Sequence, residues 1–415
     1  MLVHWIWLAE RPSVSDRLKA QLLQHFQDAE AIYYADGEAL EIAAAMPEDA
    51  HTSLQDKDLT QAEKIVQQCV NKQIGILTYR DAAYPNRLRN IPDPPVVLYY
   101  KGRIQDLDAL PLVAVVGTRH ASAYGLTVAK RMGYQIASCG GVVVSGMAYG
   151  IDGMAMQGAL TGGGFVIGVM GCGVDVVYPR SNQGLYADLE RYGCLLSEFA
   201  PGTEPYRWNF PKRNRIISGL CCGVLVVEAP EKSGALITAH QAAEQGRDVF
   251  VVPGNIDSPS CVGSNALLRD GAIAVSSGWD VVSEYAAIYP DKIHPAGTAS
   301  KQTAYPDEVA KAAQQGEQQP LLVAQKPKNI HRKDKKKKKE IDNDQSKPYI
   351  DADIKRPALS AEEETILQHI RAGQTLVDDL IAHTGMPAGP LLAALTMLEV
   401  KGLITRLPGK RVQLK

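Results

Sequence analysis

Five glycine-containing turns in the middle of the chain are the residues best suited to hold an anion. Each turn follows a short apolar run, so each is expected at the end of a strand. The turns are Gly117-Thr118-Arg119, Ser145–Asp152, Gly171-Cys172-Gly173, Ser233–Ala239 after Glu228, and Pro253-Gly254-Asn255. Glycine allows backbone N–H groups to approach a ligand closely, and a helix N-terminus favours negative charge. With Arg119 beside them, these turns predict a phosphate-binding groove at the carboxyl ends of the strands.

The common nucleotide-binding fingerprints are absent from the sequence. No GxGxxG follows the first expected strand, and no GxxxxGK[ST] occurs in the chain, so dinucleotide and Walker-type ATP sites lack their motifs. Glu228 and Asp152 could act as a base or bind a metal, but both are equally suited to accept hydrogen bonds from glycine-turn amides. No His or Cys cluster has metal-ligand spacing. We predict a protein without catalytic residues, cofactor or metal; the alternative is a nucleotide-binding or nucleotide-hydrolysing enzyme that uses Glu228.

Residues 205–217, PYRWNFPKRNRII, interleave aromatic and basic side chains. The whole chain has five Phe and four Trp, so Trp208 and Phe210 are a local enrichment. Basic groups can hold phosphates while aromatic faces stack on bases, a combination that suits single-stranded nucleic acid. The segment is equally consistent with Trp208 and Phe210 packing on the sheet edge while the basic groups lie in solvent. The residue types leave both interpretations open.

Composition confines any nucleic-acid contact to a local surface. The 415 residues include 44 Lys plus Arg and 46 Asp plus Glu, a formal net charge of -2, which argues against a protein that coats DNA over its whole surface. Apolar residues make up 45% of the chain, as in globular proteins. Seven cysteines without a CxxC pair or a signal peptide predict reduced thiols in the cytoplasm. The charge-poor stretch 132–177 is too rich in glycine for a membrane-spanning helix, so no membrane association is expected.

The elements that must position these turns alternate along residues 111–288. Continuous apolar runs separated by helical patterns predict a doubly wound α/β domain, with a parallel sheet covered on both faces. The expected strands are Leu112–Val116, Val142–Val144, Phe165–Met170, Cys194–Leu196, Val224–Val227, Val249–Val252 and Ala272–Val275. Helices are expected near Tyr124–Ser138, Ile151–Leu160, Arg213–Leu220 and Leu236–Gln245.

The flanking sequences predict three further regions. Residues 1–72 read as a small helical domain, with helices at Arg17–Phe26 and Asp58–Val70 and turns between them. Residues 73–288 then form the α/β domain, in which prolines in the bridging segment 73–110 forbid a continuous helix. Residues 289–357 are polar and aperiodic, which predicts a disordered linker. The run HRKDKKKKKE at 331–340 is either a solvated part of that linker or a nonspecific nucleic-acid tether.

Residues 358–415 predict three helices and a β-hairpin, which is the winged-helix pattern. Ser360 is the expected N-cap of the first helix. The helices are expected at Ala361–Arg371, Leu376–His383 and Ala388–Lys401, and the strands at Leu403–Leu407 and Arg411–Leu414. The third helix carries one Lys and one Glu, which is poor for reading bases in the major groove. We therefore favour protein interaction or weak DNA contact, with Arg406, Lys410 and Arg411 of the wing available to phosphates.

Six segments together resemble the DNA-processing protein A family (DprA, also called Smf). They are VVGTR at 115–119, SGMAYGID at 145–152, GVMGCGVDVVYPRSN at 168–182, SEFAPGTEPYRWNFPKRNRIISGL at 197–220, VVEAPEKSGALITAHQAAEQGRDVFVVPG at 226–254 and GSNALLRDGA at 263–272. The resemblance implies an extended Rossmann-like sheet between an N-terminal SAM-like helical domain and a C-terminal winged-helix domain. It also implies a bacterial homodimer, joined through the Rossmann-like domain, that binds single-stranded DNA, protects incoming strands during natural transformation and loads the recombinase RecA.

The resemblance assigns DNA-binding roles to ten residues. They are Arg119, Ser145, Gly146, Gly150, Lys212, Arg213, Asn214, Arg215, Ser233 and Gly234. The residue chemistry agrees with a model in which phosphates lie on backbone N–H groups at strand ends, next to Arg119 and the basic stretch 212–215. Because phosphate contacts carry little sequence information, binding should tolerate any base sequence. A further alternative is a pure adaptor, in which the winged helix docks a protein and the groove has no role.

Overall fold

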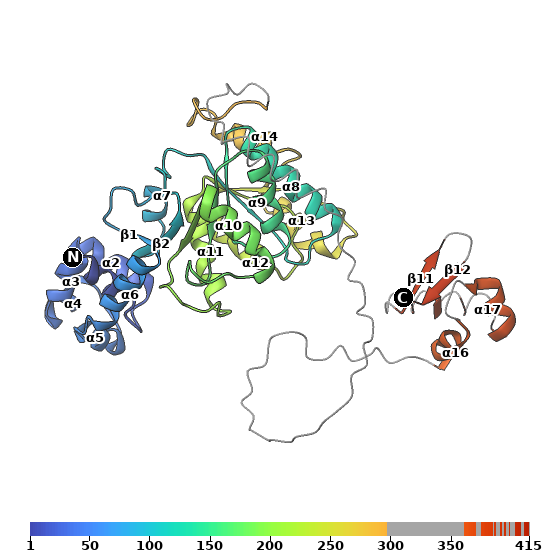
Figure 1. Cartoon of the computed structure of the whole chain (residues 1–415), viewed down its shortest axis with the longest axis horizontal. Helices are drawn as coiled ribbons and strands as arrows, with labels where there is room; N and C mark the ends of the chain where they lie inside the picture. Colours follow the sequence, from blue (N-terminus) through green and yellow to red (C-terminus); the bar gives the residue numbers. More distant parts are fainter. Residues whose placement is uncertain are drawn as a thin grey trace, which may run out of the picture. The chain divides into compact units, whose positions relative to one another are not determined.

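The computed structural model describes residues 1–296 and, in the C-terminal part, residues 361–370, 375–384, 386, 391, 394, 395, 398, 403–407 and 411–414. The chain divides into two compact units, Met1–Gln325 and Lys326–Lys415 (Figure 1). The expected linker from residue 297 onward, its Lys-rich run, Ser360 and Lys410 lie outside the described residues.

A nine-stranded sheet forms the centre of the first unit, in the order β1-β2-β6-β5-β4-β3-β7-β8-β9. The strands are β1 (Gly75–Thr78), β2 (Val97–Gly102), β3 (Leu112–Val116), β4 (Val142–Ser145), β5 (Val166–Val169), β6 (Cys194–Ser197), β7 (Gly223–Val226), β8 (Asp248–Val251) and β9 (Ile273–Ala274). All neighbours from β6 to β9 are parallel, which confirms the predicted parallel sheet. The bridging segment adds β1 and β2 to it in antiparallel pairing, so it extends the sheet.

Helices cover both faces of this sheet, as predicted for a doubly wound domain. They are α7 (Asn86–Arg89), α8 (Ala123–Ser138), α9 (Ile151–Thr161), α10 (Gln183–Tyr192), α11 (Asn209–Leu220), α12 (Gly234–Glu244), α13 (Val262–Arg269) and α14 (Gly278–Val282), with 3₁₀ turns η1 (Arg180–Asn182), η2 (Pro259–Cys261) and η3 (Ser283–Tyr285). Every residue of β3 is buried. Val113 packs in the core that includes α8 and α9, whereas Ala114 packs in the core that includes α11 and α12.

Helices α8 and α9 cross at backbone contact because each contributes a glycine. A Cβ atom at Gly133 would overlap the carbonyl oxygen of Ala155, and one at Gly158 would overlap that of Lys130. Glycine permits this close approach, since any side chain would separate the two backbones. The crossing fixes α9, which carries Asp152 at its N-terminus, against the sheet.

Six helices precede the sheet: α1 (Leu2–Ala9), α2 (Asp16–Phe26), α3 (Ala29–Tyr34), α4 (Gly37–Ala43), α5 (Glu48–Gln55) and α6 (Thr60–Asn71). Helices α2 and α6 match the predicted pair, but the prediction of turns between them is wrong because α3, α4 and α5 lie there. Asp28 and Asp36 cap α3 and α4, accepting N–H bonds at 2.8 Å from Glu30 and Ala39 respectively. Such short helices start at a cap and are too brief to show an apolar period.

The packing of the first unit continues past residue 288, where we placed the start of the linker. Ile293 is buried in the core that includes α8, and the His294 N–H donates to the Cys139 carbonyl at 3.0 Å. The predicted boundary is therefore about six residues too early for the packed structure. No helix in the described part of the chain has the length and apolar character that a bilayer crossing requires.

The second unit contains α16 (Ala361–His369), α17 (Val377–Thr384) and a small sheet in the order β10-β12-β11. Its strands are β10 (Thr375–Leu376), β11 (Ile404–Leu407) and β12 (Arg411–Leu414). Leu376, expected to open the second helix, instead pairs with Arg411 in the sheet. Within the expected third helix, the described residues Leu391, Ala394, Leu395 and Leu398 are helical and lie in the apolar core.

Candidate nucleic-acid interface

A small pocket lies at the carboxyl ends of β3, β4 and β5, the edge at which open parallel sheets bind ligands. The loops after these strands line it through Arg119, Gly146–Tyr149 and Met170–Cys172. Tyr178 and Pro179 also line it, together with Phe210 from the first turn of α11. The pocket therefore lies at the edge where we predicted the groove, and of the ten predicted residues Arg119 and Gly146 line it; phosphate binding there stays a prediction.

Arg119 supplies an exposed cation to this pocket. Its guanidinium carbon lies 5.2 Å from the centre of the Phe210 ring, in cation–π contact. The Phe210 ring lies 5.5 Å from that of Tyr178. None of the described carboxylates forms an ion pair with Arg119. The pocket thus offers a positive charge held against an aromatic wall.

Two amides of the β4–α9 loop (residues 146–150) are bound by a carboxylate of the chain itself. The Oδ2 atom of Asp152 accepts N–H bonds from Gly146 at 3.1 Å and from Ala148 at 3.4 Å. Burial raises the pKa of Asp152, although nearby Arg213 and these two N–H groups act in the opposite direction. The Gly146 N–H is therefore already used by Asp152, and contact of Gly146 with DNA stays a prediction.

Gly150 allows this loop to lie close to the backbone that follows β3. Its φ is +76°, and a Cβ atom there would overlap the carbonyl oxygen of Thr118. The loop is held from its other side by Asn182, whose Nδ2 donates to the carbonyls of Met147 at 3.0 Å and Ala148 at 3.2 Å. Gly150 therefore shapes the rim of the pocket, and a contact with DNA at this position stays a prediction.

Three of the predicted residues lie away from the pocket. Ser145 is fully buried and its hydroxyl donates to the Val115 carbonyl at 2.6 Å, so its side chain is used inside the protein and its contact with DNA stays a prediction. Ser233 caps α12, where its Oγ accepts the Ala235 N–H at 3.3 Å. Gly234 is exposed, and its carbonyl accepts from Nδ2 of Asn214 at 3.3 Å. Neither Ser233 nor Gly234 is among the residues that line the pocket.

Arg213 lies beneath the pocket and braces the strand ends. It is 3% exposed and donates to the carbonyls of Gly146, at 2.8 Å, and Val169. Burial lowers the pKa of Arg213 to about 10, against the opposing effect of Asp152. Asn214 is also buried, and its Oδ1 accepts from Nε of Arg213 at 3.2 Å. The prediction that Arg213 contacts phosphate directly is wrong, because its guanidinium is used inside the protein.

Arg215 points to the other side of α11 and is equally buried, at 3% exposure. Its two terminal nitrogens each donate to a carboxylate oxygen of Glu198 at 2.7 Å, and one also donates to Asp16 at 3.1 Å. Although burial opposes it, Glu198 and Asp16 raise the pKa of Arg215 above its ordinary value. The prediction of a direct phosphate contact is wrong for Arg215 as well.

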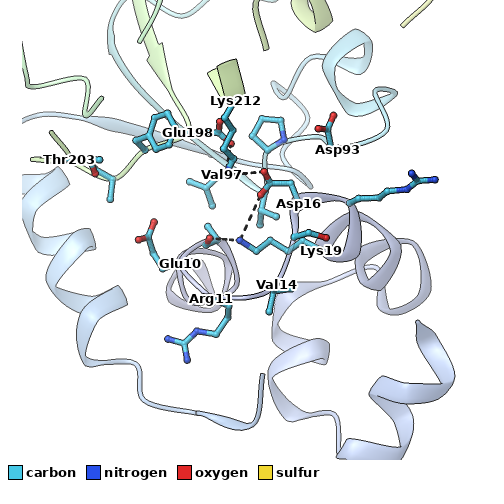
Figure 2. A pocket seen from close by; sticks show the side chains of 17 residues that line it. Glu10, Arg11, Val14, Asp16, Lys19, Asp93, Val97, Glu198, Thr203 and Lys212 are labelled. Atoms are coloured by element: carbon cyan, nitrogen blue, oxygen red, sulfur yellow. Dashed lines mark hydrogen bonds and ion pairs between the residues drawn. The ribbon is translucent and has the colours of Figure 1, made fainter. Parts of the chain in front are cut away.

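Lys212 faces a second cavity, between the N-terminal helices and the α/β sheet (Figure 2). Its ammonium lies 2.9 Å from Asp16 and 3.6 Å from Glu198. Burial opposes the charge, but these two carboxylates outweigh it and raise the pKa of Lys212. Lys19 enters the same cavity and donates to the Ala9 carbonyl at 2.5 Å. Lys212 is thus paired with two carboxylates at the second cavity and does not line the Arg119 pocket, so its contact with DNA stays a prediction.

Glu228, the candidate acid or base of the alternative enzyme, holds two loops together. One carboxylate oxygen accepts the Ser122 N–H at 2.9 Å, at the start of α8, and the other accepts the Ser260 hydroxyl. This is the amide-binding role that the sequence left open for Glu228. Across residues 1–296 and the described C-terminal segments, no group of three or more His, Cys, Asp or Glu is arranged to hold a metal, and the seven cysteines are free.

The sequence analysis missed Tyr178, and it left the role of Phe210 open. Tyr178 belongs to a segment quoted for its resemblance, but nothing in the residue order shows that it folds back over the β4–α9 loop. The segment that contains Tyr178 is held against this loop by Asn182, whose side chain donates to the carbonyls of Met147 and Ala148. The basic-aromatic segment also divides: Phe210 packs at the strand ends, whereas Trp208 is exposed.

Comparison with known proteins adds to this geometry. Residues 75–286 match the family described as DNA recombination-mediator protein A, and residues 351–410 match the DprA winged helix domain. Protein Smf of Synechocystis is 31% identical over 434 residues, covering 99% of this chain and 98% of the relative. DNA processing protein DprA of Bacillus subtilis is 46% identical over 211 residues, covering 51% of this chain and 71% of the relative.

A solved structure has the same fold over most of the chain. The X-ray structure of DNA processing protein A from Streptococcus pneumoniae superposes with a TM-score of 0.61 at 34% identity, covering 68% of this chain and 98% of that one. The match to protein Smf covers 99% of this chain and so includes the N-terminal helices. The winged-helix match falls in the second unit. Both matches agree with the architecture described above. The chain therefore belongs to the DNA recombination-mediator protein A family, known as DprA or Smf.

Proposed function

We propose that this protein binds single-stranded DNA at the Arg119 pocket and delivers it to the recombinase RecA. The observation that carries the proposal is the exposed Arg119 guanidinium held over the Phe210 ring at the carboxyl edge of the sheet. Arginine pairs with phosphate through charge-assisted hydrogen bonds, and an aromatic face suits an unpaired base. Such a site suits a family of recombination mediators, because a recombinase assembles on single-stranded DNA.

In this proposal the protein acts in the cytoplasm, without catalysis, and protects incoming strands during natural transformation. Phosphates are held first by Arg119, since Asp152 already accepts the N–H groups of Gly146 and Ala148 in the β4–α9 loop. Because the phosphate contacts are alike for every nucleotide, affinity depends little on base sequence.

Replacing Arg119 with alanine is expected to weaken binding of single-stranded DNA about tenfold to hundredfold, as for loss of a charged hydrogen bond. The slope of log affinity against log salt should also fall by about 0.7, for one lost phosphate contact. Fluorescence anisotropy with labelled single- and double-stranded oligonucleotides of equal length measures both quantities. Loading of RecA onto single strands already coated with a single-strand-binding protein should slow in parallel.

Arg191 provides a matched control for this substitution. It is an exposed arginine whose guanidinium carbon lies 5.1 Å from the Tyr192 ring, but it precedes β6 and so lies at the opposite edge of the sheet. Arg191→Ala should leave affinity and salt slope unchanged. A flat salt response of the unaltered protein, equal affinity for duplex, or full affinity in Arg119→Ala would each contradict the proposal.

We propose in addition that two copies associate through the Rossmann-like domain, by way of exposed apolar side chains on α12, α13 and β9. Ile237, Val262 and Ile273 are exposed on these three elements. Helices α12 and α13 are adjacent, since a Cβ atom at Gly263 would lie 2.8 Å from the Leu236 side chain. Exposed apolar groups on neighbouring elements mark an association surface.

Replacing Ile237 and Val262 together with glutamate is expected to convert the dimer to a monomer, because the carboxylates would be buried without partners. Size-exclusion chromatography with light scattering gives the mass. Ile42→Glu, at an exposed apolar position on α4, should leave the dimer intact. A monomeric mass for the unaltered protein would refute this association.

A further inference from the structure

Two aromatic rings are stacked on the protein surface immediately before α11. The rings of Tyr206 and Trp208 have centres 4.9 Å apart and planes inclined by 6°. Trp208 is 70% exposed and Tyr206 is 48% exposed. The other tryptophans, Trp5, Trp7 and Trp279, are buried or half-buried. The fold therefore presents a large flat apolar surface that it does not use for its own packing.

The backbone on both sides of the two rings is fixed by hydrogen bonds. The Tyr206 N–H donates to the Glu204 carbonyl at 2.8 Å, and the Asn209 N–H donates to the Tyr206 carbonyl at 3.0 Å. Asn209 is buried, and its side chain also donates to the Glu204 carbonyl at 3.4 Å. Further back, the Gly202 N–H donates to Asp175 at 2.8 Å. A ligand that stacks here would not have to order the loop, so little entropy opposes its binding.

The surroundings of the rings indicate the chemistry of the ligand. Arg207 lies between the two rings in sequence and is exposed, and Phe210, two residues after Trp208, lines the Arg119 pocket. The two rings are nearly parallel, and each has an outer face that its partner does not cover. A planar ring of a ligand can therefore extend the stack on such a face. A nucleobase has the required flat π-face whatever its identity, whereas an aliphatic side chain has no plane with which to continue the stack. The basic side chains next to these rings in the sequence, Arg207 before Trp208 and Lys212 two residues after Phe210, have the charge that suits the phosphates attached to such bases.

We propose that Tyr206 and Trp208 form a base-stacking platform, on which a strand held by Arg119 continues. The proposal rests on the single-stranded DNA binding put forward above and adds a second contact of a different kind. The pocket binds the strand mainly through its phosphates at Arg119, and the platform binds further bases by stacking alone. Binding should then depend on the presence of bases but little on their sequence, because stacking tolerates all four.

The test compares oligothymidylate with an abasic oligonucleotide of the same length, which has the same phosphates and no bases. Oligothymidylate should quench the fluorescence of exposed Trp208, and the abasic strand should not. Trp208→Ala should abolish that quenching and weaken oligothymidylate binding about 5- to 150-fold. Its affinity for the abasic strand should equal that of the unaltered full-length protein. Trp208→Phe, which keeps a π-face, should recover part of the affinity.

Tyr34→Ala is the control, since Tyr34 is an exposed aromatic residue on α3; it should bind both strands normally. Equal affinity of the unaltered protein for the two strands, or full oligothymidylate affinity in Trp208→Ala, would overturn the platform while leaving the Arg119 proposal intact. Loss of RecA loading in Trp208→Ala with unchanged DNA affinity would assign the rings to a protein contact and overturn the platform too. Failure of the unaltered protein to bind either strand would overturn the proposed function itself.

Discussion

Replacing Arg215 with methionine is expected to lower the free energy of unfolding by about 3–5 kcal/mol, as for removal of one partner from a buried ion pair. Glu198 and Asp16 would lose the guanidinium that binds both of them. Methionine fills a similar volume, so the loss measures the uncompensated carboxylates and not a cavity. Urea unfolding followed by circular dichroism gives the free energy directly.

Lys212→Met separates this effect from a general loss of positive charge. Lys212 contacts the same two carboxylates, but its side chain is 43% exposed, and ion pairs of exposed groups contribute about 1 kcal/mol or less. We expect Lys212→Met to be nearly as stable as the unaltered protein. If Arg215→Met keeps full stability and loses only DNA affinity, Arg215 contacts DNA directly and its structural role is refuted.

Replacing Asp152 with alanine is expected to lower the free energy of unfolding by a similar amount, about 3–5 kcal/mol. The N–H groups of Gly146 and Ala148 would lose their acceptor, and buried Arg213 would lose the opposite charge beside it. The β4–α9 loop should loosen as a result, which amide hydrogen exchange of residues 146–150 can detect. Thermal unfolding of the same variant measures the loss of stability.

Two further variants identify which property of Asp152 matters. Asp152→Asn keeps an oxygen that can accept the two N–H bonds, so it should lose less than Asp152→Ala. The double variant Asp152→Ala/Arg213→Met removes both buried charges, and its loss should be smaller than the sum of the two single losses. Strict additivity, or a loss below about 1 kcal/mol for Asp152→Ala, would show that the carboxylate does not hold this loop.

The sheet could be predicted from the sequence because its strands are buried on both faces. A strand such as β3 then reads as a continuous apolar run with turn residues at its ends, and the prediction Leu112–Val116 agrees with its bounds. The helices α3 to α5 could not be found in this way. Each is six to eight residues long, too short for an apolar period to be recognised.

The site was harder to predict, because the partner of a charged group is not visible in its own neighbourhood. Arginine is expected at the surface unless it is paired, so the motif containing Arg213 and Arg215 indicated phosphate binding. The groups that bury Arg215 come from distant parts of the chain, Asp16 in α2 and Glu198 after β6. Glycine-rich turns similarly suggested free amides, while Asp152, within the same motif, accepts them.

The contact between Asp16 and Arg215 also sets an order of events during protein synthesis. The two residues are separated by 199 positions. At the usual elongation rate of about 5–20 residues per second, the N-terminal helices leave the ribosome about 10–40 s before the arginine that fixes them to the sheet. Strand β2 can pair with β1 at once, but it can pair with β6 only after β6 has been synthesised. A nascent chain halted between these points holds finished helices with no surface to dock on, a form that chaperones and proteases recognise.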